Sequence, residues 1–111
     1  MEESILYTIK KLIGYDPEYT QFDLDLMIHI NTCLNTLTQL GIGPEEGFVI
    51  HGATEIWSDF LRNDSMLEMV KTYIYAKVKS IYDPPTSSAG AEALNKTASE
   101  LEWRLNVQSG V

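Results

Sequence analysis

The sequence has one cysteine and no long apolar run. Cys33 is the single cysteine among 111 residues, which excludes an intramolecular disulfide. There is no basic-then-apolar leader and no stretch of about 18 apolar residues, so we expect neither a signal peptide nor a membrane span. With 44% apolar residues, the chain is suited to one globular domain in a soluble, reducing compartment.

Positive charge is missing from the middle of the chain. Between Leu12 and Leu61 there is no lysine or arginine, whereas the acids and bases of residues 1–11 and 62–111 cancel, so the net charge of −8 belongs to the middle. The acids there are Asp16, Glu18, Asp23, Asp25, Glu45, Glu46, Glu55 and Asp59. A field of this sign repels phosphate and argues against nucleic-acid binding. A solvated surface that aids solubility is the simplest interpretation.

The residue types needed for catalysis and metal binding are sparse. His29 and Cys33 have the spacing of two metal ligands on a helix, but zinc requires more ligands and only His51 could supply one. We therefore expect Cys33 to be a buried small hydrophobe. Ser58, His51 and Asp59 do not make a triad, because adjacent helical residues diverge and no glycines flank the serine. The sequence predicts no enzyme, metal or cofactor.

Apolar residues repeat at helical spacing in four segments, which predicts an all-α, bundle-like domain. The expected helices cover residues 3–13, 22–40, 65–82 and 90–106. Their apolar stripes are Ile5, Leu6, Ile9, Leu12 and Ile13; Leu24, Met27, Ile28, Leu34 and Leu37; Leu67, Val70, Ile74, Val78 and Ile81; and Leu94, Ala98, Leu101 and Leu105. One domain over residues 1–107 is expected, with residues 108–111 as a flexible tail.

Polar residues, glycine and proline mark the ends of these helices. Gly14 and Pro84-Pro85 are expected to stop the first and third helices, with Lys10 and Lys11 at the negative end of the first. The expected caps of the later helices are Thr20; Asn63 or Ser65; and Ser87 or Ser88.

A loop or arm with several glycines spans Gly41–Gly52. Within it, Phe48–Ile50 is a short extended run that cannot anchor a sheet unless it pairs with another chain. A helix of one or two turns with an aromatic face is expected at Ile56, Trp57, Phe60 and Leu61.

Five segments, taken together, resemble the small head-tail connector proteins of long-tailed bacteriophages and prophages. They keep the family's order and span most of the chain: Leu40-Gly-Ile-Gly-Pro-Glu-Glu-Gly-Phe48, Trp57-Ser-Asp-Phe60, Val70-Lys-Thr-Tyr-Ile-Tyr75, Tyr82-Asp-Pro-Pro-Thr-Ser-Ser88 and Glu100-Leu-Glu-Trp-Arg-Leu-Asn106. Ala89-Gly-Ala91 departs from the pattern, because relatives usually carry bulkier apolar residues there. Gly90 costs a helix about 1 kcal/mol relative to alanine.

The resemblance implies an α-helical structural protein of the virion neck, made in the bacterial host cytoplasm. It implies a ring of about twelve copies that lies beneath the portal, extends the DNA channel and docks the next neck or tail-completion protein. DNA would pass through without specific binding, and no membrane is involved.

On this view we expect contacts between chains at the last helix and the Gly41–Gly52 arm. The candidate interface residues are Phe48, Ile50, Trp57, Trp103 and Arg104, and the candidate channel-facing acids are Asp16, Glu18, Asp23 and Asp25. We expect the fold to survive replacement of these four acids by lysine. Burial of Trp103 in its own chain's core is an equal alternative to an interface.

Two other functional classes remain open. A monomeric acidic helical module would bind a partner through one helix face, as a DNA mimic does, and would compete with DNA for a basic partner. An unrecognised enzyme would have a concave pocket with perturbed titrating groups.

Overall fold

The computed structural model describes residues 3–62, 64–82 and 84–109, and these residues form an all-α fold, as predicted. The helices are α1 (Ile5–Ile13), α2 (Asp23–Gln39), α3 (Trp57–Phe60), α4 (Leu67–Tyr82, preceded by a 3₁₀ turn at Asp64–Met66) and α5 (Ser88–Ser109). The described residues contain no strand, and an isolated bridge joins Ser4 to Ile56. No helix in these ranges is long and apolar enough to cross a membrane.

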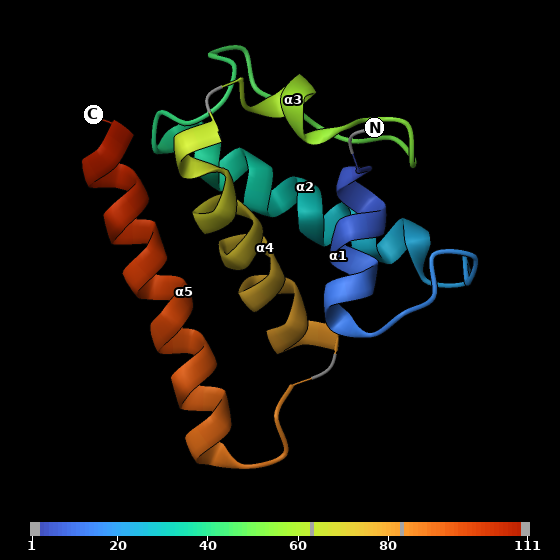
Figure 1. The fold of residues 1–111 in the computed structure, drawn as a ribbon. Coiled ribbons are helices and arrows are strands. Elements are labelled where there is room, and N and C mark those ends of the chain that lie inside the picture. The colour runs from blue at the N-terminus through green and yellow to red at the C-terminus, as the bar shows by residue number, and fades with distance from the viewer. Residues whose placement is uncertain (1–2, 63, 83, 110–111) are drawn as a thin grey trace.

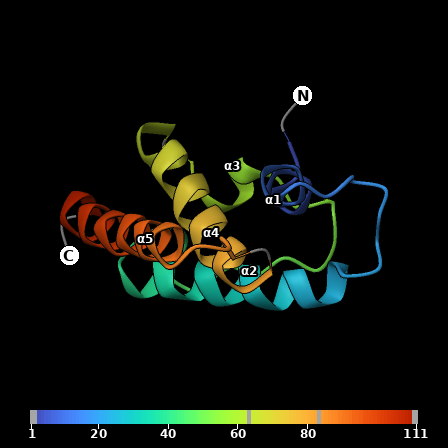
Figure 2. The ribbon, with the colours of Figure 1, turned by 90° about the horizontal axis from the view of Figure 1, so that it is seen from below.

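Helix α4 lies at the centre of the fold and packs against α1, α2 and α5 (Figure 1). Viewed from below, α2 lies along one side of the layer formed by α1, α4 and α5 (Figure 2). The molecule measures 36 × 33 × 22 Å. The arrangement leaves the outer sides of both α2 and α5 uncovered by other helices.

The ends of α1 follow the expected chemistry. The Ser4 hydroxyl caps the helix by accepting a hydrogen bond of 3.2 Å from the Tyr7 N–H, a cap that the sequence analysis did not include. Gly14 ends the helix with φ of 99°, as predicted, because glycine adopts the left-handed region without a steric cost.

The predicted stripe of α2 was wrong in two positions. Leu24 and Ile28 are 69% and 55% exposed, although they repeat at helical spacing. The buried side of α2 consists of Leu26, Ile30, Cys33, Leu34 and Leu37. Helix α2 is therefore apolar on two sides, and the fold covers the side with the longer row.

The predicted cap of α2 was also wrong. The N-cap position is Phe22, whose side chain makes no capping hydrogen bond, and Thr20 contributes its backbone carbonyl to the Asp23 N–H at 3.2 Å. The two acids in the first turn, Asp23 and Asp25, give the helix dipole favourable charge instead.

Helix α4 ends at Tyr82, as predicted, but it begins slightly later than predicted, and α5 begins earlier and ends later than predicted. Helix α4 starts at Leu67, because the 3₁₀ turn takes up the preceding residues, including the candidate cap Ser65. The other candidate, Asn63, lies outside the described residues. Helix α5 starts at Ser88 and includes Ser109, and the Ser87 hydroxyl accepts a hydrogen bond of 3.0 Å from the Gly90 N–H, which confirms Ser87 as its cap.

The core is continuous from α1 to α5. Trp57 is 2% exposed, and its indole N–H donates to the Thr8 hydroxyl at 2.9 Å, so α3 is fixed to α1 by packing and by one buried hydrogen bond. The Lys71 ammonium lies 5.7 Å from the centre of the same indole ring. Ile81 and Leu12, predicted as core residues, are 55% and 48% exposed at the ends of their helices.

Candidate functional site

Three surfaces carry the candidate site residues. The first is the loop between α1 and α2, residues 14–22, which we call the acidic loop and which projects from the helices in Figure 1. The second is the arm at residues 41–52, here the glycine-rich arm. The third is the α5 outer face, formed by Trp103 and Val107 on the side of the helix away from α4.

The acidic loop is held by a buried lysine. Lys10 is fully buried, and its ammonium donates to the carbonyl oxygens of Pro17 at 2.9 Å and Tyr19 at 2.6 Å. It also forms an ion pair of 2.8 Å with Asp23. The two carbonyl oxygens accept hydrogen bonds from the ammonium, and the Asp23 carboxylate supplies the opposite charge that a buried ammonium requires. Lys10 lies in the last turn of α1, as predicted, but its ammonium is buried and holds the loop that follows the helix.

Aromatic side chains close the same loop. The rings of Tyr15, Tyr19 and Phe22 contact one another, with centroid separations of 5.9 to 6.1 Å. The Asp16 carboxylate accepts a hydrogen bond of 2.8 Å from the Glu18 N–H. These contacts give the loop a defined shape before any partner binds.

The four candidate channel-facing acids do not share one environment. Asp16, Glu18 and Asp25 are exposed, but the Asp23 side chain is only 21% exposed and is paired with Lys10. Lysine at position 23 would place a second ammonium beside the buried one. This pairing argues against lysine at position 23, and the three exposed acids are the stronger candidates for the channel.

The glycine-rich arm finds a partner within its own chain. The Asn31 side-chain amide of α2 donates to the Ile50 carbonyl at 3.0 Å, and its oxygen accepts from the Ile50 N–H at 2.7 Å. One side chain thus satisfies both backbone groups of Ile50, as a neighbouring strand would. The run at Phe48–Ile50 does not need a second chain to order it.

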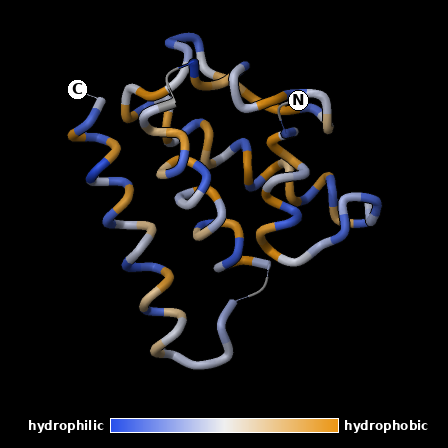
Figure 3. The backbone as a smooth tube through the Cα atoms, viewed as in Figure 1, coloured by the Kyte–Doolittle hydropathy of each residue, from blue (hydrophilic) through white to orange (hydrophobic). Residues whose placement is uncertain are grey.

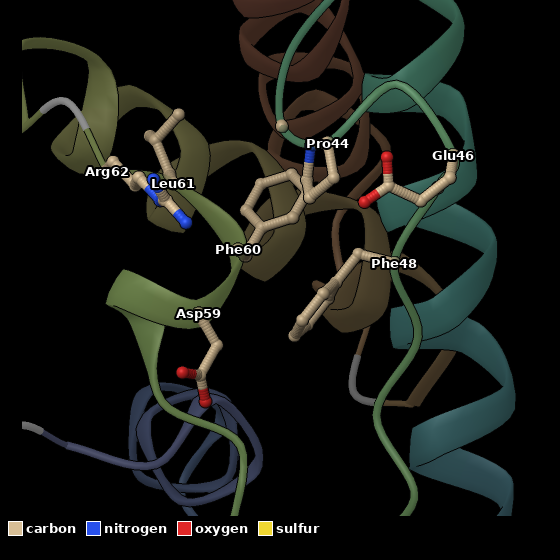
Figure 4. A pocket seen from close by; sticks show the side chains of 9 residues that line it. Pro44, Glu46, Phe48, Asp59, Phe60, Leu61 and Arg62 are labelled. Carbon is tan, nitrogen blue, oxygen red and sulfur yellow. The ribbon is translucent and has the colours of Figure 1, made fainter.

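An open groove of about 580 Å³ lies between this arm and α3 (Figure 4). Its apolar surface includes Phe48 and Phe60, whose ring centroids are 5.6 Å apart. Gly43 has φ of 85°, and a Cβ atom there would overlap the Phe60 ring. Glycine is therefore required both by the backbone conformation and by the close approach of the ring.

The polar side chains that line the groove are two carboxylates and one guanidinium, from Glu46, Asp59 and Arg62. The Asp59 carboxylate already accepts a hydrogen bond of 3.0 Å from the Ile56 N–H. The lining residues include no serine, cysteine, histidine or lysine, so they do not provide a hydroxyl or thiol nucleophile with a histidine base.

Within the described residues, His29 and Cys33 make packing contacts and do not form a metal site. Cys33 is 5% exposed, and burial raises the pKa of its thiol to about 11, which disfavours the thiolate that binds metals. The His29 ring lies edge-on to Tyr82 with centroids 5.5 Å apart. The described residues bring no three His, Cys, Asp or Glu side chains together as a metal site. The predicted core role of Cys33 is confirmed.

The observed exposure of the candidate interface residues contradicts part of the interface prediction. Trp57 and Ile50 are each 2% exposed and belong to the core, so we do not carry them forward as interface residues. Trp103 is 66% exposed, so the alternative that placed it in its own core is wrong. Phe48 is half-buried at the groove.

The α5 outer face is the most apolar exposed part of the last helix. Trp103 and Val107 are 66% and 60% exposed, opposite the buried Ala98 and Leu105. Hydrophilic and hydrophobic residues alternate along α5 (Figure 3), as they do in a helix with one covered side. Arg104 binds Glu100 through two N–H groups at 3.0 and 2.8 Å, and both side chains are exposed. Nothing else in the described chain covers this face.

The comparison with known families gives one match over most of the chain. A family model described as "Phage connector protein" matches residues 5–111 and so includes every helix described above. No curated protein and no solved structure matches the chain.

Proposed function

The chain belongs to the phage connector protein family, and from this premise we propose that it is a structural head-tail connector in the neck of a tailed phage. In this proposal the protein assembles as a ring beneath the portal, extends the DNA channel and docks the next neck or tail-completion protein. The observation that carries the proposal is the family match over residues 5–111. A structural family of this kind implies a non-enzymatic role.

Ring assembly is supported by the exposed apolar surface of the last helix. A closed ring joins two different patches of each subunit, so every subunit needs apolar surface that its own fold leaves open. The α5 outer face provides one such patch, with Trp103 as the large side chain that typically anchors a protein interface. The groove beside the glycine-rich arm is a second concave surface, which we assign to the portal or to the next neck protein.

The acidic loop supports a lumen that DNA passes without adhering. Asp16 and Glu18 are exposed on a loop fixed by Lys10, so their charges hold defined positions that water and salt reach. A dry subunit contact would bury unpaired carboxylates at a cost of several kcal/mol each. We therefore propose that this loop faces the channel or its entrance.

The experiment that tests the function is a mass measurement of the purified protein, alone and mixed with its portal. We expect a closed oligomer on the portal, seen as a single ring by electron microscopy. A protein that stays monomeric in both samples and competes with DNA for a basic partner would instead be the acidic helical module.

The electrostatic part of the proposal has its own test. The purified protein should show no measurable affinity for duplex DNA at low salt, where electrostatic binding is strongest. Replacing Asp16 and Glu18 by lysine, with Asp23 and Asp25 of α2 unchanged, should preserve the fold but slow DNA passage during packaging or ejection. Tight duplex binding by the unaltered protein would refute the acidic lumen, and a ring with these two carboxylates on its outer rim would refute the orientation.

A further inference from the structure

We propose that neighbouring copies of this chain join through two helix faces, the α5 outer face of one copy and the exposed side of α2 at Leu24 and Ile28 in the next. This contact rests on the proposed ring and names the two patches that form it. The partner is thus a second copy of the same chain.

Both faces present large apolar side chains in the same arrangement. Trp103 and Val107 are 66% and 60% exposed, and Leu24 and Ile28 are 69% and 55% exposed. Each pair is spaced four residues apart, so its members lie one turn apart on one side of a helix. Two such rows can interdigitate, because rows of residues four apart pack into each other at a crossing angle of about −50°.

The two faces cannot cover each other within one copy. The carboxyl-terminal half of α5 and the amino-terminal half of α2 lie at opposite ends of the molecule in both ribbon views (Figures 1 and 2). Each pair also points away from the buried residues of its own helix, Leu105 in α5 and Leu26 in α2. Both faces are free to contact another copy at the same time.

The α5 outer face has the Arg104 guanidinium beside Trp103, and the exposed side of α2 has the Asp25 carboxylate beside Leu24. Arg104 adjoins Trp103, and its ion pair with Glu100 is exposed, so little free energy holds the guanidinium in place. Asp25 adjoins Leu24, is exposed, and lies in the part of the chain that has no lysine or arginine. A guanidinium that turns from Glu100 towards Asp25 of the next copy would fix the register of the helices.

A contact between two different patches also favours closure. In an open chain of copies, one α5 outer face and one exposed α2 side remain in water at the two ends. A closed ring covers both, so the last contact forms without further loss of freedom between separate molecules. Burial of the apolar side chains and closure of the ring therefore both favour a closed oligomer over an open chain of copies.

Cysteine cross-linking tests the contact directly. In a Cys33→Ala background, one chain carries Leu24→Cys and a second, separately tagged chain carries Val107→Cys. We expect the mixture to form a disulfide between the two chains under mild oxidation, at least tenfold faster than a control mixture in which Leu12→Cys replaces Leu24→Cys. Leu12 is a suitable control because it is an exposed leucine, 48% accessible, on a different helix. Equal rates in the two mixtures would overturn the contact.

Charge reversal gives a second, independent measurement. Arg104→Glu and Asp25→Arg should each reduce the oligomer fraction, and the double variant should restore most of it, as native mass spectrometry would show. Rings that tolerate both single variants would contradict this contact while leaving the proposed function intact. Selective cross-linking in a protein that never binds its portal would keep the contact and refute the ring beneath the portal.

Discussion

The two tryptophans lie in regions that use apolar surface in opposite ways. Trp57 lies on α3, where packing against α1 leaves its side chain 2% exposed. Trp103 lies on α5, which buries only Ala98 and Leu105 and leaves the indole 66% exposed. The Trp57 side chain therefore contributes to the core, whereas most of the Trp103 side chain is exposed to solvent.

The largest expected effect comes from the buried tryptophan. Trp57→Ala removes a large core side chain and leaves the Thr8 hydroxyl without its donor, and we expect a loss of about 3 to 5 kcal/mol in the free energy of unfolding. Urea denaturation followed by circular dichroism measures it. Trp57→Phe keeps most of the packing and should lose much less. A loss below about 1 kcal/mol in the alanine variant would contradict the conclusion that Trp57 stabilises the core.

Removal of the partner of the buried lysine should have the next largest effect. Asp23→Ala leaves the Lys10 ammonium without its counter-ion, and we expect a loss of about 3 kcal/mol, the lower end for a buried pair, because Asp23 is partly exposed. The matched control is Asp25→Ala, an exposed acid two residues along the same helix, which should change stability by less than about 0.5 kcal/mol. Equal losses in the two variants would mean that general helix-end charge, and not the buried pair, stabilises this region.

The arm contact should contribute a smaller amount. Asn31→Ala leaves the N–H and C=O of Ile50 without their partner, and we expect a loss of about 1 to 3 kcal/mol. Hydrogen exchange should show the Ile50 amide losing protection while amides within α4 keep theirs. Asn35→Ala, an exposed position one turn along α2, is the control. If the Ile50 amide stays protected, another group must hold the arm.

Burial of Cys33 predicts a decline in stability at alkaline pH. Its thiol pKa is raised from 9.0 to about 11, so between these values the unfolded chain loses a proton that the folded chain retains. Stability therefore falls as the pH rises through this window, by at most about 1.4 kcal/mol per pH unit for this group. Denaturation at pH 8 and pH 10.5 measures the decline. Cys33→Ala should make it shallower, and an unchanged slope would assign it to buried tyrosines such as Tyr73, whose pKa burial also raises.

The smallest effect on stability is expected at the exposed tryptophan. Trp103→Ala should change the free energy of unfolding by less than about 0.5 kcal/mol, because the indole has few contacts within its own chain. The same variant should nevertheless lose assembly with the portal or with other copies, measured by the mass of the complex. A folded variant that assembles normally would end the comparison, since Trp103 would then serve neither the fold nor an interface.

The sequence was sufficient for the helices because their signals are local. Apolar spacing located the four long helices, and Gly14 and Ser87 marked a stop and a cap correctly. The correct side of α2 could also have been found, since Leu26, Ile30, Cys33 and Leu37 form a longer row than the pair at Leu24 and Ile28. That pair misled the prediction because an exposed apolar pair and a core row use the same residue types.

The remaining errors concern contacts between distant or backbone atoms. Lys10 is satisfied partly by the carbonyl groups of Pro17 and Tyr19, and no side-chain pattern signals a backbone acceptor. Asn31 and Ile50 are 19 residues apart, and Trp57 and Thr8 are 49 apart, so their pairing follows from the assembled fold. The two tryptophans could not be distinguished by residue type alone.

The close approach of Gly43 to Phe60 has a consequence for how this family varies. A side chain at position 43 is excluded both by the positive φ of 85° and by the Phe60 ring, so the two positions are not independent. Among related chains, the loss of this glycine should coincide with a smaller residue at the position of Phe60 and with a change in the backbone path of the arm. Substitution at one position alone should be rare, so an alignment of many relatives would show the two sites changing together.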